Sequence, residues 1–184
     1  MEEQIRIQVP YFSQYRDVSD EAWQFRACAI VNLKMVLEYY KNKYPERGIP
    51  SNSIEDLITQ GVQLNGYIGA GWVHDVIVIL ARNYGCSAYR QEFRSSDPAF
   101  ENKFVEEGIA KIWKTVAEGS PVTVSVLPDF GQNTQFHTIL IVGIGEDGFY
   151  YHDPKSHTIE EGMYQHVTID RFKQFWRKFA IFIY

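Results

Sequence analysis

Three side chains that can perform nucleophilic chemistry together, Cys28, His137 and Asp153, stand in suitable places along the sequence. Cys28 lies where an irregular segment gives way to an apolar helical pattern, so its thiol is expected at the positive end of a helix, which favours the thiolate. A thiolate nucleophile needs an imidazole as acid and base, and the imidazole needs a partner on its other nitrogen. His137 and Asp153 are predicted to supply these groups.

The places of the two partners favour this interpretation. His137 opens an apolar run in which a histidine has no packing role, and Asp153 ends the next extended run. Gln14, in the segment ahead of the helix, offers an amide donor for an oxyanion. Taken singly, each residue has an ordinary explanation: Cys28 as core, His137 as a hydrogen-bonded strand residue, Asp153 as a turn former, Gln14 as a solvated side chain. Taken together, they favour a catalytic site.

The second cysteine is not expected to react. Cys86 follows a helix stop at Gly85 and enters an apolar strand. A thiol in such surroundings is buried, and burial disfavours the thiolate. The sequence therefore predicts Cys28 as the reactive thiol.

The register of one hairpin decides whether His137 and Asp153 can touch. With a two-residue loop at 146–147 and a regular ladder, the two side chains point to opposite faces of the sheet, because side chains alternate along a strand. One extra residue in the loop or in a bulge would make them diagonal neighbours on one face. The catalytic pairing therefore predicts an odd loop or a bulge between residues 138 and 152.

Three glycines at this hairpin match a nucleotide-binding pattern. Gly143, Gly145 and Gly148 have the spacing G-x-G-x-x-G. That motif binds a pyrophosphate only where a strand leads into a helix, and here an extended run, 149–152, follows. We interpret the glycines as a hairpin turn in which Gly145 or Gly148 takes a positive φ.

No metal or cofactor is expected. His152, Asp153 and His157, with His137, come nearest to a metal cluster. On a strand His152 and Asp153 point to opposite faces, so they are poorly placed to chelate one ion. We interpret these histidines as surface residues around the turn at Pro154. The two cysteines form neither a C-x-x-C zinc motif nor a disulfide framework.

The elements that position these residues divide along the chain. Helical patterns come first and extended patterns later, which predicts an α+β fold: a helical N-terminal half packed on a C-terminal antiparallel β-sheet, in a single domain over 1–184. The expected helices are 28–41, 53–61, 72–84, 100–118 and 167–178; the expected strands are 5–9, 121–127, 136–144, 148–153 and 179–184, with a loop over 11–27.

Composition limits the partners. A net charge of −5 disfavours binding to a nucleic-acid backbone, which needs a basic face. No apolar run approaches the roughly 20 residues of a membrane span. The first residues lack a signal-peptide pattern. A cytoplasmic location is expected if Met1 is the natural start; the alternative is a secreted mature domain whose leader has been removed. The oligomeric state is not indicated.

An ordered set of short motifs resembles the C39-like branch of the papain-like cysteine peptidases. The motifs are VPYFSQ (9–14), Trp23, AC (27–28) opening a helix, EGSPV (118–122), FHTILIVG (136–143), GFYYHDP (148–154) and a segment from Phe172 to Trp176. The resemblance covers nearly the whole chain and implies a papain-like fold. It also implies peptide hydrolysis through a thioester acyl-enzyme, with a peptide or protein as substrate.

The resemblance implies a role for each of the four residues: Cys28 as nucleophile, His137 as base, Asp153 as the group that orients it, and Gln14 in the oxyanion hole. One departure concerns the residues after the cysteine. The family commonly has Gly-Pro or Gly-x there, whereas this chain has Ala29-Ile30, and a side chain at position 29 is expected to crowd a substrate backbone. Acyl transfer to an amine and peptide binding without turnover therefore stay open as alternatives.

Overall fold

Strands from both halves of the chain assemble into one antiparallel β-sheet in the computed structural model, which describes residues 4–69, 71–127, 130 and 137–184. The strands are β1 (Ile5–Arg6), β2 (Ala88–Glu92), β3 (Val122–Val126), β4 (His137–Ile144), β5 (Gly148–His152), β6 (Gln165–Thr168) and β7 (Trp176–Ile183). Their order across the sheet is β2-β7-β3-β4-β5-β6, and β1 pairs with β4 beside this path.

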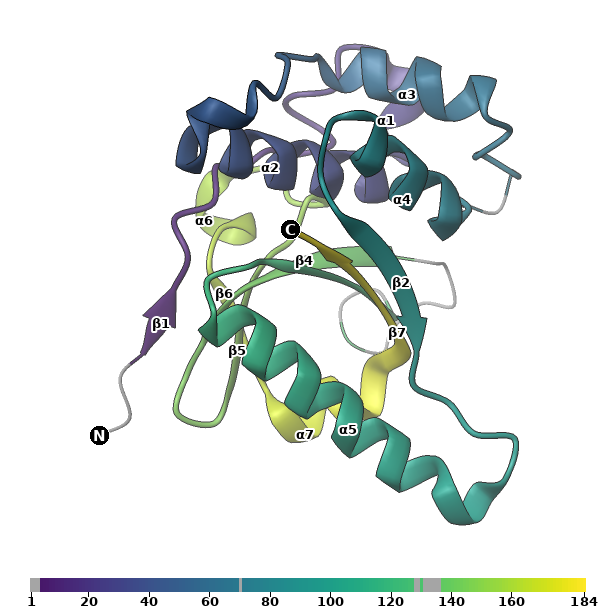
Figure 1. The fold of residues 1–184 in the computed structure, drawn as a ribbon, viewed down its shortest axis with the longest axis vertical. Helices are drawn as coiled ribbons and strands as arrows, with labels where there is room; N and C mark the ends of the chain where they lie inside the picture. The colour runs from purple at the N-terminus through teal and green to yellow at the C-terminus, as the bar shows by residue number, and fades with distance from the viewer. Residues whose placement is uncertain (1–3, 70, 128–129, 131–136) are drawn as a thin grey trace.

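Helices cover both faces of the sheet (Figure 1). They are α1 (Glu21–Gln24), α2 (Cys28–Lys43), α3 (Ile54–Gln63), α4 (His74–Asn83), α5 (Pro98–Ala117), α6 (Ile159–Gly162) and α7 (Ile169–Phe175), with a 3₁₀ turn η1 at Pro45–Arg47. Helices α1–α4 lie on one side of the sheet, and α5 and α7 on the other. The predicted α+β fold is confirmed, although β2 and α5 depart from the simple division into two halves.

Some predicted boundaries are wrong because short, polar elements leave weak periodic signals. The expected loop 11–27 contains α1, whose first turn is capped by the Asp20 side chain. The expected helix 167–178 is divided between three elements: it begins within the edge strand β6, continues through α7, and ends in β7. The expected strand 5–9 is reduced to the two residues of β1. Phe136, the expected start of β4, lies outside the described residues.

Helix α3 begins where the sequence predicts and ends later. Ser53 caps it in a capping box with Asp56, as the sequence indicates. Gly61 does not end the helix, which continues to Gln63. A Cβ at Gly61 would lie 2.5 Å from the ring of Trp72, so the glycine serves close packing between α3 and the segment before α4. Across the described ranges, every helix is too short or too polar to cross a lipid bilayer.

Helix α2 forms the centre of the helical layer and packs against β4. Three of its apolar residues, Ile30, Leu33 and Leu37, are at most 1% exposed. Burial on most sides of the helix holds its first residue, Cys28, at a fixed place beside the sheet.

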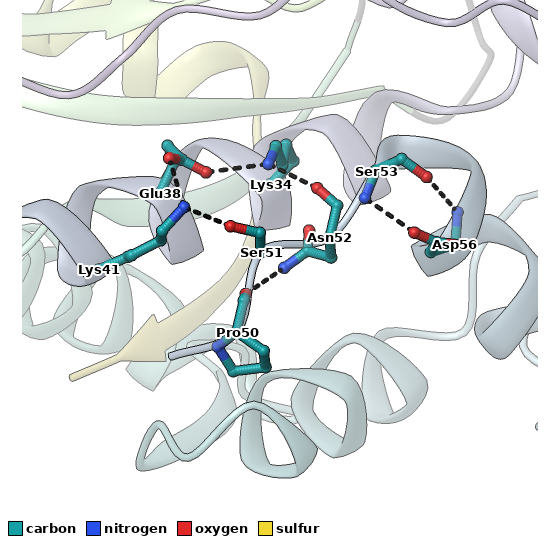
Figure 2. Close-up of polar contacts among 8 residues, drawn as sticks. All are labelled: Lys34, Glu38, Lys41, Pro50, Ser51, Asn52, Ser53 and Asp56. Atoms are coloured by element: carbon teal, nitrogen blue, oxygen red, sulfur yellow. Dashed lines mark hydrogen bonds and ion pairs between the residues drawn. The ribbon is translucent and has the colours of Figure 1, made fainter. Parts of the chain in front are cut away.

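A network of polar contacts ties α2 to the segment that leads into α3 (Figure 2). The Lys34 ammonium lies 2.9 Å from a carboxylate oxygen of Glu38 and donates to the Asn52 carbonyl at 2.7 Å. Lys41 reaches the other oxygen of Glu38 and donates to the hydroxyl of Ser51. Because the Lys34 side chain is only 11% exposed, its charge depends on these partners.

Glu38→Ala is expected to lower the free energy of unfolding by about 1–3 kcal/mol, because it leaves the buried Lys34 ammonium without its carboxylate. Urea denaturation monitored by circular dichroism measures the change. Glu107→Ala is the matched control, since it removes an exposed i,i+4 pair with Lys103 at 3.9 Å. That control should change stability by less than about 0.5 kcal/mol. Equal losses in the two variants would contradict the structural role of the network.

Candidate active site

Cys28 is the first residue of α2 and is partly exposed, whereas Cys86 is buried; both thiols are free. Ala27, the N-cap residue of α2, has no side-chain group that could satisfy the first backbone N–H groups of the helix. Those N–H groups carry the positive end of the helix dipole, so an anion at Cys28 is favoured. The predicted start of a helix at Cys28 is confirmed, and its role as nucleophile stays a prediction.

His137 and Asp153 lie in direct contact. The imidazole Nε2 of His137 is 2.8 Å from Oδ1 of Asp153, which leaves Nδ1 as the ring nitrogen that can face Cys28. The contact is possible because β4 and β5 pair irregularly: Gly143 opposes Tyr150, but Ile141 opposes Tyr151. One extra residue, Val142, therefore bulges from β4. The predicted bulge between 138 and 152 is confirmed, and it follows a two-residue turn.

The glycines of this hairpin allow neighbouring backbone segments to approach closely. Gly145 donates its N–H to the carbonyl of Gly148 at 2.8 Å, which closes the turn and confirms the hairpin interpretation. The expectation of a positive φ at Gly145 or Gly148 is wrong: neither residue adopts one. A Cβ at Gly148 would lie 1.9 Å from the Val167 carbonyl, and one at Gly143 would lie 2.4 Å from the Ile5 carbonyl. These contacts leave no room for a side chain.

The backbone around Asp153 is anchored by several hydrogen bonds. Its N–H donates to the Gly162 carbonyl at 2.8 Å, and its own carbonyl accepts from the Tyr11 hydroxyl at 2.8 Å. The side-chain Oδ1 also accepts from the Lys155 N–H at 2.8 Å. These contacts hold the carboxylate where His137 meets it. Tyr11 is partly buried, which raises its pKa to about 12, so its hydroxyl remains a donor at neutral pH.

Gln14 lies beside the loop that carries Asp153. Its backbone N–H donates to the Pro154 carbonyl at 2.7 Å, and the hydroxyl of neighbouring Ser13 donates to the Ser156 carbonyl. The Gln14 side chain is only 3% exposed, and its Oε1 has no hydrogen-bond partner among the described residues. The expectation of a solvated side chain as its ordinary explanation is therefore wrong. An amide with an unused acceptor in a buried place is more typical of a site than of a structural link.

Two further polar residues belong to this arrangement and were missed by the sequence analysis. The Asn32 amide donates to the Thr138 hydroxyl at 3.0 Å, and both side chains are buried. Asn32 lies one helical turn after Cys28, and Thr138 follows His137. The available signal was a polar residue at i+4 from the cysteine on an otherwise apolar helix face. Because the Thr138 oxygen accepts from Asn32, its own proton is free to point toward the thiol.

The charges of the site favour a thiolate beside an imidazolium. Burial raises the pKa of the Cys28 thiol, but hydrogen bonds and charge at His137, and then at Thr138, outweigh it and lower the pKa overall. Burial lowers the pKa of His137, but the charge and hydrogen bond of Asp153 raise it well above its ordinary range. Burial also raises the pKa of Asp153, but the charge and hydrogen bond of His137 lower it, and the net shift is downward. Burial raises the pKa of Cys86.

The histidines around Pro154 do not converge. His152 is fully buried, with Nε2 3.2 Å from the Val9 carbonyl and Nδ1 accepting from the Tyr164 N–H at 3.1 Å. The prediction that it lies on the surface is therefore wrong, because these two partners satisfy both of its ring nitrogens inside the fold. His157 is exposed and stacks on Tyr15 at 4.2 Å between ring centroids. Within the described ranges, no group of three or more potential ligands is arranged to hold a metal ion.

A cavity of about 880 Å³ opens at Cys28. Its lining includes Cys28, Ala29 and Thr138, and also the aromatic residues Tyr67 and Trp72. Its volume is sufficient for several residues of an extended peptide. Ala29, the residue after the cysteine, lines the cavity although it is only 2% exposed.

Comparison with known proteins shows the family and the fold. The model of the Peptidase C39 like family matches residues 6–181. A sequence search of curated proteins found no match. Similar folds occur in a protein of Bacillus anthracis described as a C39-like peptidase (16% identity, TM-score 0.68, covering 99% of this chain and 98% of that one). A double glycine motif protease from an AMS/PCAT transporter, solved with the leader peptide, also has a similar fold (18% identity, TM-score 0.62, covering 97% of this chain and 93% of that one). The peptidase domain of Streptococcus ComA is similar as well (18% identity, TM-score 0.59, covering 86% of this chain and 91% of that one).

The fold is therefore that of the papain-like C39 peptidase domains. At these identities the structural likeness concerns the fold alone. Because the family match extends over nearly the whole sequence, the chain belongs to the Peptidase C39 like family. The resemblance of the short motifs to the C39-like branch is confirmed.

Iodoacetamide at mildly acidic pH is expected to modify Cys28 and leave Cys86 unmodified in the folded protein. The lowered pKa keeps Cys28 a thiolate at a pH at which ordinary thiols are protonated, and its reactivity should fall only when the pH drops through that shifted pKa. In His137→Ala the labelling should slow at acidic pH, because the neighbouring cation is lost. Peptide mapping by mass spectrometry identifies the labelled site. Equal labelling of both cysteines, or an unchanged rate in His137→Ala, would contradict the assignment.

Thr138→Val is expected to move the pH midpoint of Cys28 alkylation upward, because it removes a hydroxyl donor to the thiolate and keeps the side-chain shape. Thr123→Val is the matched control: it makes the same change on β3, where the Thr123 hydroxyl is buried without a partner among the described residues. The control should leave the midpoint where it is. Equal shifts in both variants would show that Thr138 acts only through packing.

Proposed function

We propose that this chain is a cysteine peptidase that cleaves peptide or amide bonds through a thioester acyl-enzyme. The observation that supports this most directly is the contact of His137 with Asp153 beside the start of α2, where Cys28 stands. In this proposal the whole chain, 1–184, acts as one catalytic domain, and the cavity at Cys28 receives a peptide or protein.

The first half of the reaction forms the acyl-enzyme. The Cys28 thiolate attacks the carbonyl carbon of the scissile bond, and the electron pair of the carbonyl moves to oxygen. The Gln14 amide donates to this oxyanion. The imidazolium of His137 gives its proton to the leaving nitrogen, the C–N bond breaks, and a thioester to Cys28 remains.

The second half returns the enzyme to its starting state. His137, now neutral, takes a proton from water while the water oxygen attacks the thioester carbonyl. The C–S bond breaks, the carboxylic acid leaves, and the proton on His137 restores the ion pair with the thiolate. Throughout, Asp153 holds the imidazole by Nε2 and stabilises its charged form.

Digestion of a peptide library, with products identified by mass spectrometry, tests the proposal. Wild-type protein should release free carboxylic acids, and Cys28→Ala should release none. His137→Ala should lose about 10²–10⁴-fold in rate, and Asp153→Asn less, because an amide can still orient the ring. New amide products in the presence of added amines would instead indicate acyl transfer. Binding of peptides without products would indicate a silent binding module.

Gln14→Ala should reduce turnover by about 10²-fold or more while peptide binding to a Cys28→Ala background stays unchanged, because the oxyanion exists only in the transition state. Gln165→Ala, a substitution on the edge strand β6, is the control and should affect neither quantity. Parallel losses of binding and turnover in Gln14→Ala would assign this residue to the ground-state complex.

A further inference from the structure

Asn32 is a polar residue on a stretch of α2 that is otherwise apolar. Its neighbours from Ala29 to Leu33 are buried hydrophobic residues, and Asn32 itself is 0% exposed. Its Nδ2 donates to the Thr138 hydroxyl on β4 at 3.0 Å, whereas its Oδ1 has no hydrogen-bond partner among the described residues. The amide is therefore only half satisfied inside the core.

Packing alone does not account for an amide at this position. A buried polar group that lacks a partner lowers stability, because it has given up its hydrogen bonds to water. A leucine side chain branches at the same atom and carries no polar group that would need a partner. Departures from an apolar core are typical of functional sites, so the one bond that Asn32 makes is where its role is to be found.

That bond acts on the residue next to His137. Thr138 lines the cavity together with Cys28 and is 5% exposed. A threonine hydroxyl has one proton to donate and can accept through its oxygen. Because the oxygen accepts from Asn32, the proton is directed elsewhere, and hydrogen bonds of Thr138 are among the influences that lower the pKa of Cys28.

Regular elements hold the three residues in place. Cys28 and Asn32 are four residues apart on α2, so they lie on the same face of the helix. Helix α2 packs against β4, the strand that carries Thr138. Donation from amide to hydroxyl to thiolate polarises each group and strengthens the next bond. The amide therefore has a route by which it can act on the thiol.

We propose that Asn32 is a positioning residue whose amide fixes the Thr138 hydroxyl as a hydrogen-bond donor to the Cys28 thiolate. For the reaction, the proposal rests on the peptidase function proposed above. No proton is transferred along this path. The hydroxyl stabilises the thiolate before its attack, and again when the C–S bond of the thioester breaks and its electron pair returns to sulfur. Asn32 acts only through Thr138.

Other groups also affect the thiol. After burial, His137 has the largest influence on the pKa of Cys28, and Asp153 acts through His137. Charged or titratable groups reach the cavity from four other segments: Arg26, the start of α4 at His74 and Asp75, residues 90–94, and Arg177. The substitutions Asn32→Leu and Asn32→Ala leave all these groups unchanged, so a shift in the titration of Cys28 reports the hydroxyl donor.

The pH dependence of Cys28 alkylation by iodoacetamide tests the role of Asn32 without a substrate. Asn32→Leu removes the amide donor and keeps the side-chain size, so the pH midpoint should rise by roughly one unit, the size of one hydrogen bond to a charged group. Asn32→Ala should give the same rise, because it lacks the same donor although it packs differently.

Asn52→Leu is the matched control for this experiment. The Oδ1 of Asn52 is also buried without a partner in the described part of the chain, but its Nδ2 donates to the Pro50 carbonyl at 3.2 Å. Neither Asn52 nor Pro50 lines the cavity at Cys28. The control should leave the pH midpoint unchanged, and an equal rise in Asn32→Leu and Asn52→Leu would overturn the proposal.

Thermal unfolding separates this role from packing. Asn32→Leu should unfold at the temperature of the wild-type protein or above it, because the substitution removes a half-satisfied amide from the core, while its Cys28 reacts more slowly at mildly acidic pH. A purely structural role of Asn32 predicts the reverse: a lower unfolding temperature with an unchanged pH midpoint.

A double variant tests the route through the hydroxyl. In Thr138→Val protein, Asn32→Leu should cause no further rise of the midpoint, since the group through which Asn32 acts is absent. Full additivity of the two shifts would show that Asn32 acts by another route and would overturn the proposal. A midpoint that falls in Asn32→Leu would do the same, because the amide would then compete with the thiolate for the Thr138 proton.

Peptide cleavage by the same proteins separates this proposal from the function on which it rests. At mildly acidic pH, kcat of Asn32→Leu should fall while KM is unchanged, because the thiolate population is reduced and peptide binding is not. A raised midpoint in Asn32→Leu without cleavage by the wild-type protein would keep the role of Asn32 and remove the peptidase function. Cleavage with equal midpoints in the two proteins would keep the peptidase function and remove the role of Asn32.

Discussion

The contact between His137 and Asp153 depends on one extra residue in β4. With a regular ladder from the two-residue turn onward, alternation would place the two side chains on opposite faces of the sheet. The bulge at Val142 reverses this parity, so Nε2 of His137 comes within 2.8 Å of the carboxylate. The raised pKa of His137 and the lowered pKa of Cys28 both follow from that contact. The electrostatics of the whole site thus depend on a backbone irregularity away from the reacting atoms.

The two sides of the site are assembled by contacts between distant parts of the chain. The segment before α2 is bound to the segment after β5 through Tyr11, Ser13 and the backbone of Gln14. On the helical side, the polar network of Lys34 and Glu38 binds α2 to the residues before α3 (Figure 2). The first contacts place the carboxylate and the amide, and the second stabilise the helix that carries the thiol. The buried charge of Lys34 is paired with Glu38, and that of His137 with Asp153.

Apolar periodicity and turn residues were sufficient to predict the parts of the site that lie on regular helices and strands. The start of α2 at Cys28, the buried strand opened by His137 and the position of Asp153 after β5 all follow from apolar periodicity and turn signals. Contact between His137 and Asp153 required an odd loop or a bulge, so the sequence could predict one. It did not indicate that the bulge lies at Val142. Asn32 and Thr138 were missed because their contact joins a helix to a strand, and the burial of His152 was missed because both of its partners are backbone groups from other segments. Short elements such as β6 take their shape from sheet pairing, which leaves little trace in the sequence.

A regular ladder repeats every two residues, so sequence periodicity describes it well and departures from it poorly. The sheet contains two such departures near the site, the single extra residue in β4 and the two extra residues in β7 between Trp176 and Ala180. The first brings an acid to the base, and the second directs Arg177 and Phe179 into the same cavity. A two-residue insertion preserves the parity of β7, so Phe182 and the other core residues beyond it keep the face that they would have in a regular ladder. The strand therefore contributes Arg177 and Phe179 to the cavity lining without giving up its place in the core.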